Sequence, residues 1–481
     1  MDPQNDLAIP SGLRNPADLF FQKETIRRTI IASYWITILL ALPLWWHTTS
    51  IERLPLPEAR VYHQVDKPIS IPVRLCLPQS NTDLSARLQG TLSARVPKGL
   101  EVVVESGNCG TEKDAYVVSS GPKKMVQGRH LTTPFDDFDG LTQTIVSLVA
   151  PSDVEQEKQT RVAQFASRYR LAFSLLNEDA STGNSVMSWD VQKGIHRQIQ
   201  PLLDVLKPLH NFTIESQVQY YAPLEFDLRP TDSGFGLSYE DLTVFINSAE
   251  WTLSSSASND PVLHFILFVP SASHTPLRII DSKSSAFILP QWGGVSIYNT
   301  PSIGSTQELS DRGLQRAFST FSTQLITLLG IPQLPADIQQ SPEDTGLISQ
   351  WQLDALTRRR MLETAKGTRD TLRSFIKLAN QLENMPVRED VRNDIEGSLD
   401  ALEKLYNSAS TSLSQSFAYS AEAFNLASRA FFNPGMLALL YFPTEHKYAV
   451  YAPLFASGLV PLFVSALREL KAWKQQRAQR R

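Results

Sequence analysis

Two long uncharged runs near the ends of the chain constrain its structure more than any other feature. The first, Thr29 to Trp46, contains no charged side chain over 18 residues, and the second, Tyr448 to Leu467, contains none over 20. A helix of 18 residues is about 27 Å long, close to the ~30 Å hydrocarbon core of a bilayer. We therefore expect transmembrane helices at 29–46 and 448–467.

Two alternatives also fit the first run, a buried core helix and a cleaved signal peptide, which shares the basic start and apolar middle. Signal cleavage requires small residues, and Leu42–Trp46 contains none, which favours an uncleaved anchor. A tryptophan ring gains most where it lies in an apolar layer while its N–H reaches water or a headgroup. Trp45 and Trp46 are therefore predicted to anchor the helix at a membrane face.

The second run has the features of a kinked membrane helix. Pro453 and Pro461 would break a water-exposed helix, but a membrane tolerates them because neighbouring helices and local backbone adjustments satisfy the freed carbonyls. Small side chains allow helices in a membrane to approach closely. We expect helix packing at the small residues Ala452, Ala456, Ser457 and Gly458.

Basic residues flank both runs on the side of the chain ends. They are Lys23, Arg27 and Arg28 before the first run, and Arg468, Lys471, Lys474, Arg477, Arg480 and Arg481 after the second. Lysine and arginine accumulate on the cytoplasmic side of membrane segments. The tails 1–28 and 468–481 are therefore predicted to be cytosolic. The roughly 400 residues between the runs are expected in the lumen of the endoplasmic reticulum (ER) or a later compartment.

Charge, cysteine content and one sequon indicate which partners, disulfide, metal site and glycan to expect. The net charge is −4 over 481 residues without a long basic stripe, so we expect membrane lipids but no nucleic acid as partners. The two cysteines, Cys76 and Cys109, could form a disulfide in an oxidising lumen, although spacing alone leaves this open. Neither has a second cysteine at metal-ligand spacing, so no zinc site is expected. The sequon Asn211-Phe212-Thr213 predicts a glycan on Asn211.

Residues 47–345 are predicted to form a mixed α/β domain. Short β-rich runs broken by Pro, Gly and Asn indicate a strand-and-turn region at 60–120. Apolar spacing and β-branched runs predict helices at 155–176, 188–209 and 308–329, and strands at 211–221, 262–269 and 294–299. Strands separated by helices indicate a mixed sheet covered by helices, which could divide into two subdomains.

Residues 346–447 are predicted to be helical. Apolar stripes at 353–382 and 391–424, separated at Pro386, indicate a hairpin of two long antiparallel helices. The apolar segment 431–442 is too short to cross a bilayer, and we expect it at the membrane interface. The fold class is thus α/β with a long-helix hairpin, between two membrane helices.

The chain contains none of the catalytic signatures that short motifs reveal, neither a G-x-S-x-G elbow, nor a phosphate loop, nor an H-E-x-x-H helix. Asp137 and Asp139 form a D-x-D pattern, which in an ER glycosyltransferase could hold the metal of a nucleotide sugar. Such triplets are common, and a solvated acidic turn is the simpler interpretation. A cysteine nucleophile would need a nearby base, and the histidines are scattered. No cofactor or metal is expected.

Several long strings in the chain resemble the PIG-S family of GPI transamidase subunits. They are "LPLWWHTTSIERLPLP" (Leu42–Pro57), "SLLN" (Ser174–Asn177), "WDV" (Trp189–Val191), "NFTIESQVQYYA" (Asn211–Ala222), "WGGVSIYN" (Trp292–Asn299) and "LLYFPTEHKYAVYAPLF" (Leu439–Phe455). They run in order between the two predicted membrane helices, so the resemblance covers nearly the whole chain.

The resemblance implies membership of the ER-membrane complex that cleaves a C-terminal signal from a precursor and joins the new carboxyl end to glycosylphosphatidylinositol (GPI). It also implies a non-catalytic role, because the nucleophile of that complex belongs to another subunit, a caspase-like cysteine protease. Two hypotheses remain at this point. One is a luminal scaffold for assembly and stability of the complex, and the other is a membrane-anchored enzyme such as a glycosyltransferase using Asp137 and Asp139.

Overall fold

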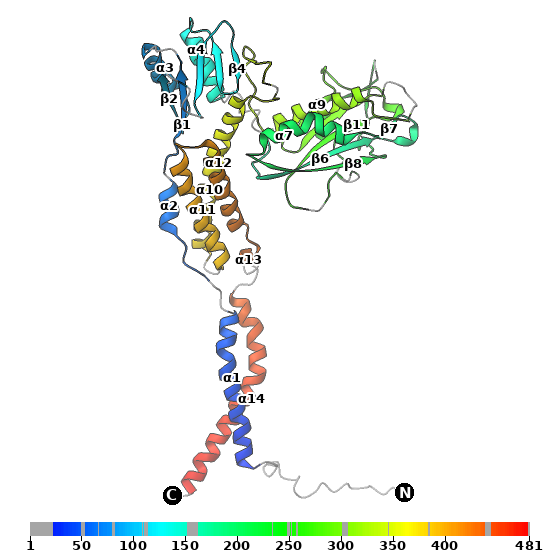
Figure 1. Ribbon diagram of the computed structural model, residues 1–481. Coiled ribbons are helices and arrows are strands. Elements are labelled where there is room, and N and C mark those ends of the chain that lie inside the picture. Colours follow the sequence, from blue (N-terminus) through cyan, green and yellow to red (C-terminus); the bar gives the residue numbers. More distant parts are fainter. Residues whose placement is uncertain are drawn as a thin grey trace, which may run out of the picture. The chain divides into compact units, whose positions relative to one another are not determined.

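The computed structural model describes residues 23–49, 53–65, 67–78, 82–107, 109, 114–151, 162–232, 234–247, 251, 253–255, 258–300, 306–344, 346–382, 385–437 and 444–479 (Figure 1). The chain forms two compact units. The helical unit contains the described residues of 1–58, 374–394 and 429–481, and the α/β unit contains those of 59–373 and 395–428.

The first sheet of the α/β unit has six strands in the order β16-β4-β5-β3-β1-β2. They are β1 (Ile71–Leu77), β2 (Leu100–Ser106), β3 (Tyr116–Ser120), β4 (Met125–Gln127), β5 (His130–Thr133) and β16 (Gln339–Gln340). The neighbours β2, β1, β3 and β5 run parallel, whereas β4 is antiparallel to β5. Parallel neighbours need a crossover, which α3 (Thr82–Arg95) supplies between β1 and β2. Helix α4 (Phe138–Val149) follows β5.

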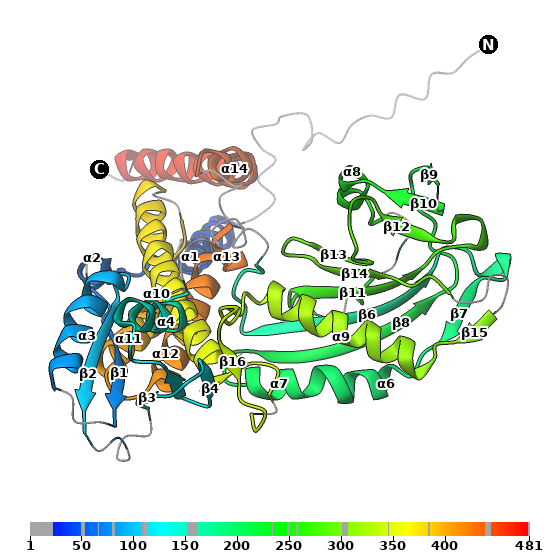
Figure 2. The ribbon, with the colours of Figure 1, turned by 90° about the horizontal axis from the view of Figure 1, so that it is seen from above.

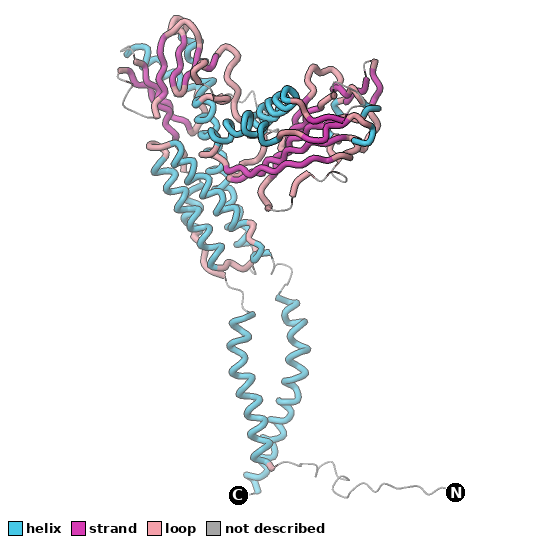
Figure 3. The backbone as a smooth tube through the Cα atoms, turned by 45° about the vertical axis from the view of Figure 1, so that its right-hand side comes forward, coloured by secondary structure: helices cyan, strands magenta, loops and turns pink. Residues whose placement is uncertain are grey.

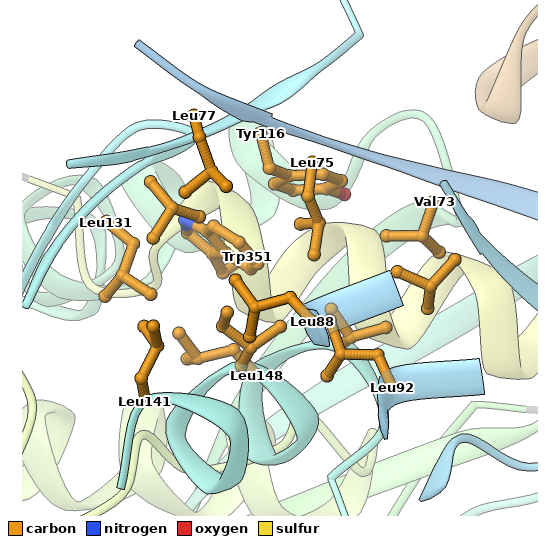
Figure 4. Packing of buried hydrophobic residues seen from close by; sticks show 14 of the residues in the cluster. Val73, Leu75, Leu77, Leu88, Leu92, Tyr116, Leu131, Leu141, Leu148 and Trp351 are labelled. Carbon is orange, nitrogen blue, oxygen red and sulfur yellow. The ribbon is translucent and has the colours of Figure 1, made fainter. Parts of the chain in front are cut away.

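The core of the first sheet includes a tryptophan that comes from far along the chain. Trp351 belongs to helix α10 (Gln350–Gln381), is fully buried, and lies 4.2 Å from the Tyr116 ring between centroids. Figure 4 shows it among leucines of β1, α3 and α4, including Leu75, Leu88 and Leu148. Burying a large aromatic side chain stabilises a fold by about 1.5–3 kcal/mol, so this core ties α10 to the sheet.

The second sheet of the α/β unit has five strands in the order β13-β14-β11-β6-β8. They are β6 (Arg168–Asn177), β8 (Asn211–Gln219), β11 (Val262–Val269), β13 (Ala286–Leu289) and β14 (Gly293–Ile297). All neighbours are parallel except β13 and β14. Figure 2 shows one face covered by α6 (Val191–Gly194), α7 (Gln200–Leu206) and α9 (Asp311–Leu328). Between α6 and α7 the chain makes a π-helical turn, η4 (Ile195–Ile199).

Smaller elements surround this sheet. They are the 3₁₀ turns η3 (Ala180–Thr182) and η5 (Ala272–His274), helix α8 (Tyr239–Thr243), the three-stranded sheet of β9 (Arg229–Thr231), β10 (Gly234–Leu237) and β12 (Leu277–Ile279), and the pair β7 (Ser185–Ser188) and β15 (Thr306–Glu308). The predicted mixed α/β class is confirmed, as are the strands predicted at 211–221, 262–269 and 294–299 and the helices at 188–209 and 308–329.

The prediction of a helix at 155–176 is wrong for the residues of this range that the structure describes. Residues 168–177 form strand β6, a central strand that is buried on both faces, and 152–161 lie outside the described residues. A continuous apolar run does not alternate, so its periodicity cannot separate a buried strand from a helix. Tyr169, Leu171 and Phe173 lie two residues apart along this strand, although their spacing also approximates one face of a helix.

The strand-and-turn region predicted at 60–120 also needs correction, because it contains two helices, α2 (Glu58–Val65) and α3. Leu88 and Leu92 of α3 are fully buried, and the helix contains Gly90 and several Ser and Thr residues. These residue types have low helix propensity, so the local sequence carries little helical signal. Packing of α3 against the sheet, rather than intrinsic helix propensity, therefore stabilises this helix.

The predicted helix hairpin contains three helices, because the second predicted helix divides into α11 (Glu389–Ser408) and α12 (Leu413–Phe431). The break falls in the run Ser408–Ser412, where the Ser412 hydroxyl accepts a hydrogen bond from the Gln415 N–H at 3.4 Å. Serine is a strong N-cap and disfavours helix interiors, which explains the break. In the α/β unit, Thr364 of α10 and Ser420 of α12 lie in contact, with their hydroxyl oxygens 2.5 Å apart.

The helical unit contains α1 (Glu24–Thr49), α13 (Pro434–Leu437) and α14 (Thr444–Gln479). Within α1 and α14, the segments Thr25–Trp45 and Ala449–Gln475 are long and apolar enough to cross a membrane, and neither is buried in the protein. Figure 3 shows the two helices approaching each other toward their chain-terminal ends and separating in the other direction. Of the segment predicted at the interface, 431–442, residues 438–442 lie outside the described part of the chain.

Candidate functional site

The D-x-D pair lies at the beginning of helix α4. Asp137 precedes the first residue of the helix, and Asp139 lies in the first turn, where its exposed carboxylate is 3.7 Å from the Arg95 guanidinium. Carboxylates are favourable at a helix N-terminus because of the helix dipole. Within the described part of the chain, no group of three or more His, Cys, Asp or Glu side chains is arranged to hold a metal ion.

The two cysteines, 33 positions apart in sequence, lie next to each other in the α/β unit. The sulfur atoms of Cys76, near the end of β1, and Cys109 are 2.00 Å apart, and their Cα atoms are 5.6 Å apart. Both separations are those of a bonded pair. Cys76 is buried, so the arrangement would fix the segment after β2 to the sheet.

A glutamate–histidine pair lies beyond the carboxyl ends of β6 and β11, with Glu178 buried and the His274 side chain 36% exposed. After β6 the chain adds β8 on one side of it, and the next strand of this sheet, β11, is added on the other side. The direction in which strands are added therefore reverses between β6 and β11. Open α/β sheets bind ligands at such a point. Here Oε1 of Glu178 forms a hydrogen bond with Nδ1 of His274 at 2.5 Å. Its other oxygen, Oε2, accepts a hydrogen bond from the Ser271 N–H at 2.8 Å. Each carboxylate oxygen therefore has a partner, and the pair joins the two strand ends.

Amide side chains hold the loops around this pair. Asn177 donates to the Val186 carbonyl at 2.9 Å and accepts from the Val186 N–H at 2.8 Å. Asn184 donates to the Pro270 carbonyl at 2.9 Å and also contacts Thr300. These residues are buried, and buried polar groups need such partners to avoid a desolvation cost. The arrangement fixes the loops between strands rather than presenting free groups to a substrate.

A second buried network joins α10 to the first sheet. Asp354 accepts from the Tyr116 hydroxyl at 2.6 Å, from Nε of Arg129 at 2.7 Å and from Gln350 at 2.8 Å. Arg358 donates to the Tyr116 oxygen at 2.6 Å. Burial raises the pKa of Tyr116, and the hydrogen bond and charge of Asp354 raise the pKa of Arg129 although burial opposes this. The network keeps Tyr116 protonated and Arg129 charged.

Two buried histidines are neutral near pH 7. Burial lowers the pKa of His210 to about 4, and the nearby charge of Arg360 acts in the same direction, although His210 also bonds the Ala166 carbonyl through Nδ1 at 2.7 Å. Burial likewise lowers the pKa of His264 to about 4, while the charge of Glu215 opposes the shift. His264 stacks on Trp292 with 4.4 Å between ring centroids. Both belong to the packing around the second sheet.

Strand β8 is the edge of the second sheet and pairs with no other described strand on its outer side. Asn211, the predicted glycan site, is exposed at its first residue. Exposed apolar side chains lie along the strand and beyond its far end. We call this group the β8 surface, and it comprises Met187 (39% exposed), Ile214 (38%), Tyr220 (49%) and Tyr221 (67%). The Tyr220 hydroxyl donates to the Met187 carbonyl at 3.2 Å.

The predicted membrane residues do not form a single face. Trp45 contacts the aromatic rings of Tyr451 and Phe455 on α14, with centroids 5.7 and 5.4 Å apart. The side chain of Trp46 lies outside the described residues. Of the four small residues, Gly458 lines a cavity between α1 and α14. The other three are exposed and do not line it: Ala452, Ala456 and Ser457. Their packing against partner helices stays a prediction.

An ion cluster joins α1 to α14 near the chain ends. Glu469 contacts Nε of Arg27 and, at 3.1 Å, Nε of Arg28. No sequence motif pointed to this cluster, because Glu469 is more than 440 positions from Arg27 and Arg28. The sequence signal for this cluster is Glu469 itself, an acidic residue inside an otherwise basic tail.

Comparisons with known proteins cover nearly the full chain. The family model described as "Phosphatidylinositol-glycan biosynthesis class S protein" matches residues 32–114 and 112–476. The "GPI-anchor transamidase component PIGS" of Mus musculus is 29% identical over 92% of this chain and 95% of its own length. The "GPI transamidase component PIG-S homolog" of Schizosaccharomyces pombe is 28% identical over 95% and 86%. The "GPI transamidase component GPI17" of Saccharomyces cerevisiae is 23% identical over 92% and 91%.

Proposed function

The chain belongs to the PIG-S family and is a component of the GPI-anchor transamidase complex, and we propose that it acts there as a non-catalytic luminal scaffold. The observation that carries the proposal is the family match, which extends from the first membrane helix to the second. The proposed partners are the other subunits of the complex, including the caspase-like subunit that the resemblance implies.

The chemistry of the described side chains supports a non-catalytic role. The Cys76 and Cys109 sulfurs lie at bonding distance, and a bonded sulfur cannot serve as a thiolate nucleophile. Asp139 is solvent-exposed next to Arg95, which fits a surface ion pair. Glu178 and His274 hold strand ends together. We therefore favour the scaffold over a glycosyltransferase that uses Asp137 and Asp139.

We place the chain in the ER membrane with both ends in the cytosol. The basic residues Arg27 and Arg28 lie at the start of α1, and six Arg and Lys residues follow 448–467, as a cytosolic location favours. The boundaries are those predicted from sequence: tails at 1–28 and 468–481, spans at 29–46 and 448–467, and luminal regions at 47–345 and 346–447. An oxidised Cys76–Cys109 pair and a glycan on Asn211 would both agree with luminal placement.

The β8 surface is our candidate contact with another subunit. A long edge strand presents unpaired backbone groups, and exposed tyrosine and methionine side chains are enriched in protein interfaces. The glycan predicted at Asn211 would need solvent around it. Strand β8 runs from Asn211 to Gln219, about 26 Å, so a partner at the tyrosine end would leave room for the glycan.

The contact is tested by purifying the complex through this subunit in mild detergent. Tyr221→Glu would place a charge in the interface, and we expect at least a tenfold loss of co-purified subunits at an unchanged level of the chain itself. Tyr239→Glu is the matched control, because Tyr239 is 81% exposed but lies on α8 outside the β8 surface. Equal recovery of the complex with both variants would contradict a role for the β8 surface.

The non-catalytic role is tested by rescue of cells that lack this subunit, scored by a GPI-anchored reporter at the cell surface. We expect Asp137→Asn, Asp139→Asn and Glu178→Gln to restore anchoring whenever the complex assembles at its normal level. Loss of a nucleophile costs on the order of 10⁶ in rate in well-studied hydrolases, so the outcomes differ clearly. A variant that assembles normally but abolishes anchoring would overturn the proposal.

A further inference from the structure

An apolar cavity of ≈ 760 Å³ lies between the two membrane helices. It is lined by residues of α1 between Tyr34 and Trp45 and by residues of α14 between Leu454 and Phe463, all of them aliphatic, aromatic, alanine or glycine. No charged side chain lines it. Because both segments are exposed helices that can cross a membrane, the medium around the cavity is the hydrocarbon of the bilayer.

Aromatic contacts between the helices bound the cavity at two levels. Trp35 meets Phe463 with ring centroids 5.1 Å apart, and Trp45 meets Phe455 at 5.4 Å. Gly458 lies between these levels on α14, and a Cβ built on it would meet no atom within 4 Å. Close packing of the two helices is therefore interrupted at Gly458, and the aromatic side chains hold the backbones apart on either side.

The dimensions of the cavity limit what can fill it. From Tyr34 to Trp45, α1 rises about 16 Å, roughly half of the ~30 Å hydrocarbon core, which is the depth of one leaflet. A helix 10–12 Å wide and 16 Å long occupies about 1,500 Å³, twice the volume available. An apolar cavity also does not hold ordered water, which needs polar partners. A single acyl chain matches both the length and the apolar lining.

We propose that α1 and α14 bind one acyl chain of a phospholipid from the luminal leaflet. The choice of leaflet rests on the proposed topology, in which both chain ends are cytosolic. Trp45 ends the cavity on the side away from the basic flanks, which is then the luminal side. A phospholipid is favoured over the complex's own glycolipid substrate because the cavity lining offers no cluster of polar or charged groups that could hold a glycan.

The test uses the intact complex, purified from cells fed a fatty acid that carries a photoreactive group at mid-chain. After irradiation, peptides that include Tyr34–Trp45 and Leu454–Phe463 should carry phospholipid label. Gly458→Phe places an aromatic ring in the cavity where an acyl chain would lie, and we expect at least a fivefold loss of label in these peptides. Val460→Phe is the matched control, because Val460 is 58% exposed on α14 and does not line the cavity, and this variant should be labelled like the wild type.

Three results would overturn the assignment: equal labelling of the two variants, a cross-link from the cavity lining to another polypeptide, or a glycolipid as the labelled species. If Gly458→Phe does not accumulate, Ala41→Phe on the facing helix places a ring in the same cavity and takes its place. Recovery of the other subunits is measured in the same preparation. Loss of lipid with full recovery of subunits separates this proposal from the scaffold function.

Discussion

Replacing Asp354 by asparagine tests whether a charged network holds α10 against the first sheet. Asparagine keeps the shape of the side chain but removes the negative charge that faces Arg129 and, through the Tyr116 hydroxyl, Arg358. One amide hydrogen would also point at a group that now donates a hydrogen bond to Asp354. The substitution therefore removes the charge without creating a cavity.

The expected cost follows from the burial of the partners. Asp354 is 4% exposed and the side chain of its ion-pair partner Arg129 is 26% exposed, and removing one partner of a buried charged pair costs about 3–5 kcal/mol. The α/β unit contains roughly 350 residues, which gives an unfolding entropy of about 0.7 kcal/mol per kelvin. The melting temperature should therefore fall by about 4–7 °C.

The assay is thermal unfolding of the full-length chain in detergent, followed by the tryptophan fluorescence of the α/β unit. Asp400→Asn is the matched control, since Asp400 is 58% exposed and pairs with Arg60 at 2.8 Å on the surface. An exposed pair contributes about 0–1 kcal/mol, so the control should shift the melting temperature by less than about 1.5 °C. Equal shifts for the two variants would refute the reasoning.

Four further predictions concern the glycan, the topology, the disulfide and the buried histidines. Asn211→Gln should remove one glycan's mass on a gel, and an unmodified Asn211 peptide from the wild type would contradict this. Protease added to intact microsomes should trim only the tails, and digestion of the central 400 residues would reverse the topology. Non-reducing peptide mapping should recover Cys76 linked to Cys109, and replacing both by alanine should cost about 4 kcal/mol for a 33-residue loop, read as a lower denaturation midpoint. His210 and His264 should make the fold acid-labile: their pKa is about 6.5 unfolded and about 4 folded, so the unfolded chain binds protons first and stability falls below pH 6.5, by about 2 kcal/mol each at pH 5. Equal melting temperatures at pH 7 and pH 5 would contradict this.

The elements that the sequence predicted correctly are those whose local pattern is unambiguous. The run "VLHFILFV" is β-rich and bounded by Pro261 and Pro270, and it forms β11 over the predicted residues. The run in β6 is similarly apolar, but its flanks carry charged and polar residues that also suit a helix. Burial on both faces removes the alternation that would have separated the two. Tertiary packing, rather than local propensity, decides the structure of β6.

The candidate sites also differ in whether their signal is local in the sequence or depends on the fold. Asn211 and the membrane helices carry local signals, a sequon and uncharged runs, and could be found from sequence. Glu178 and His274 are 96 positions apart, and Tyr116 and Asp354 are 238 positions apart. Contacts at such separations depend on the fold, so no motif could have revealed them. The cavity between α1 and α14 is likewise invisible in either helix alone.

The division of the chain into units also bears on how the protein is made. The helical unit is assembled from three separate stretches of chain, of which the first ends at Glu58 and the next begins at Ser374. A ribosome adding 5–20 residues per second needs roughly 15–60 s to synthesise the segment between them. During this time α1 has already been synthesised, while α14 and Glu469, the partner of Arg27 and Arg28, do not yet exist. A truncated chain can therefore complete much of its α/β unit but never pair α1 with α14, so this helix pair distinguishes a finished copy from an unfinished one.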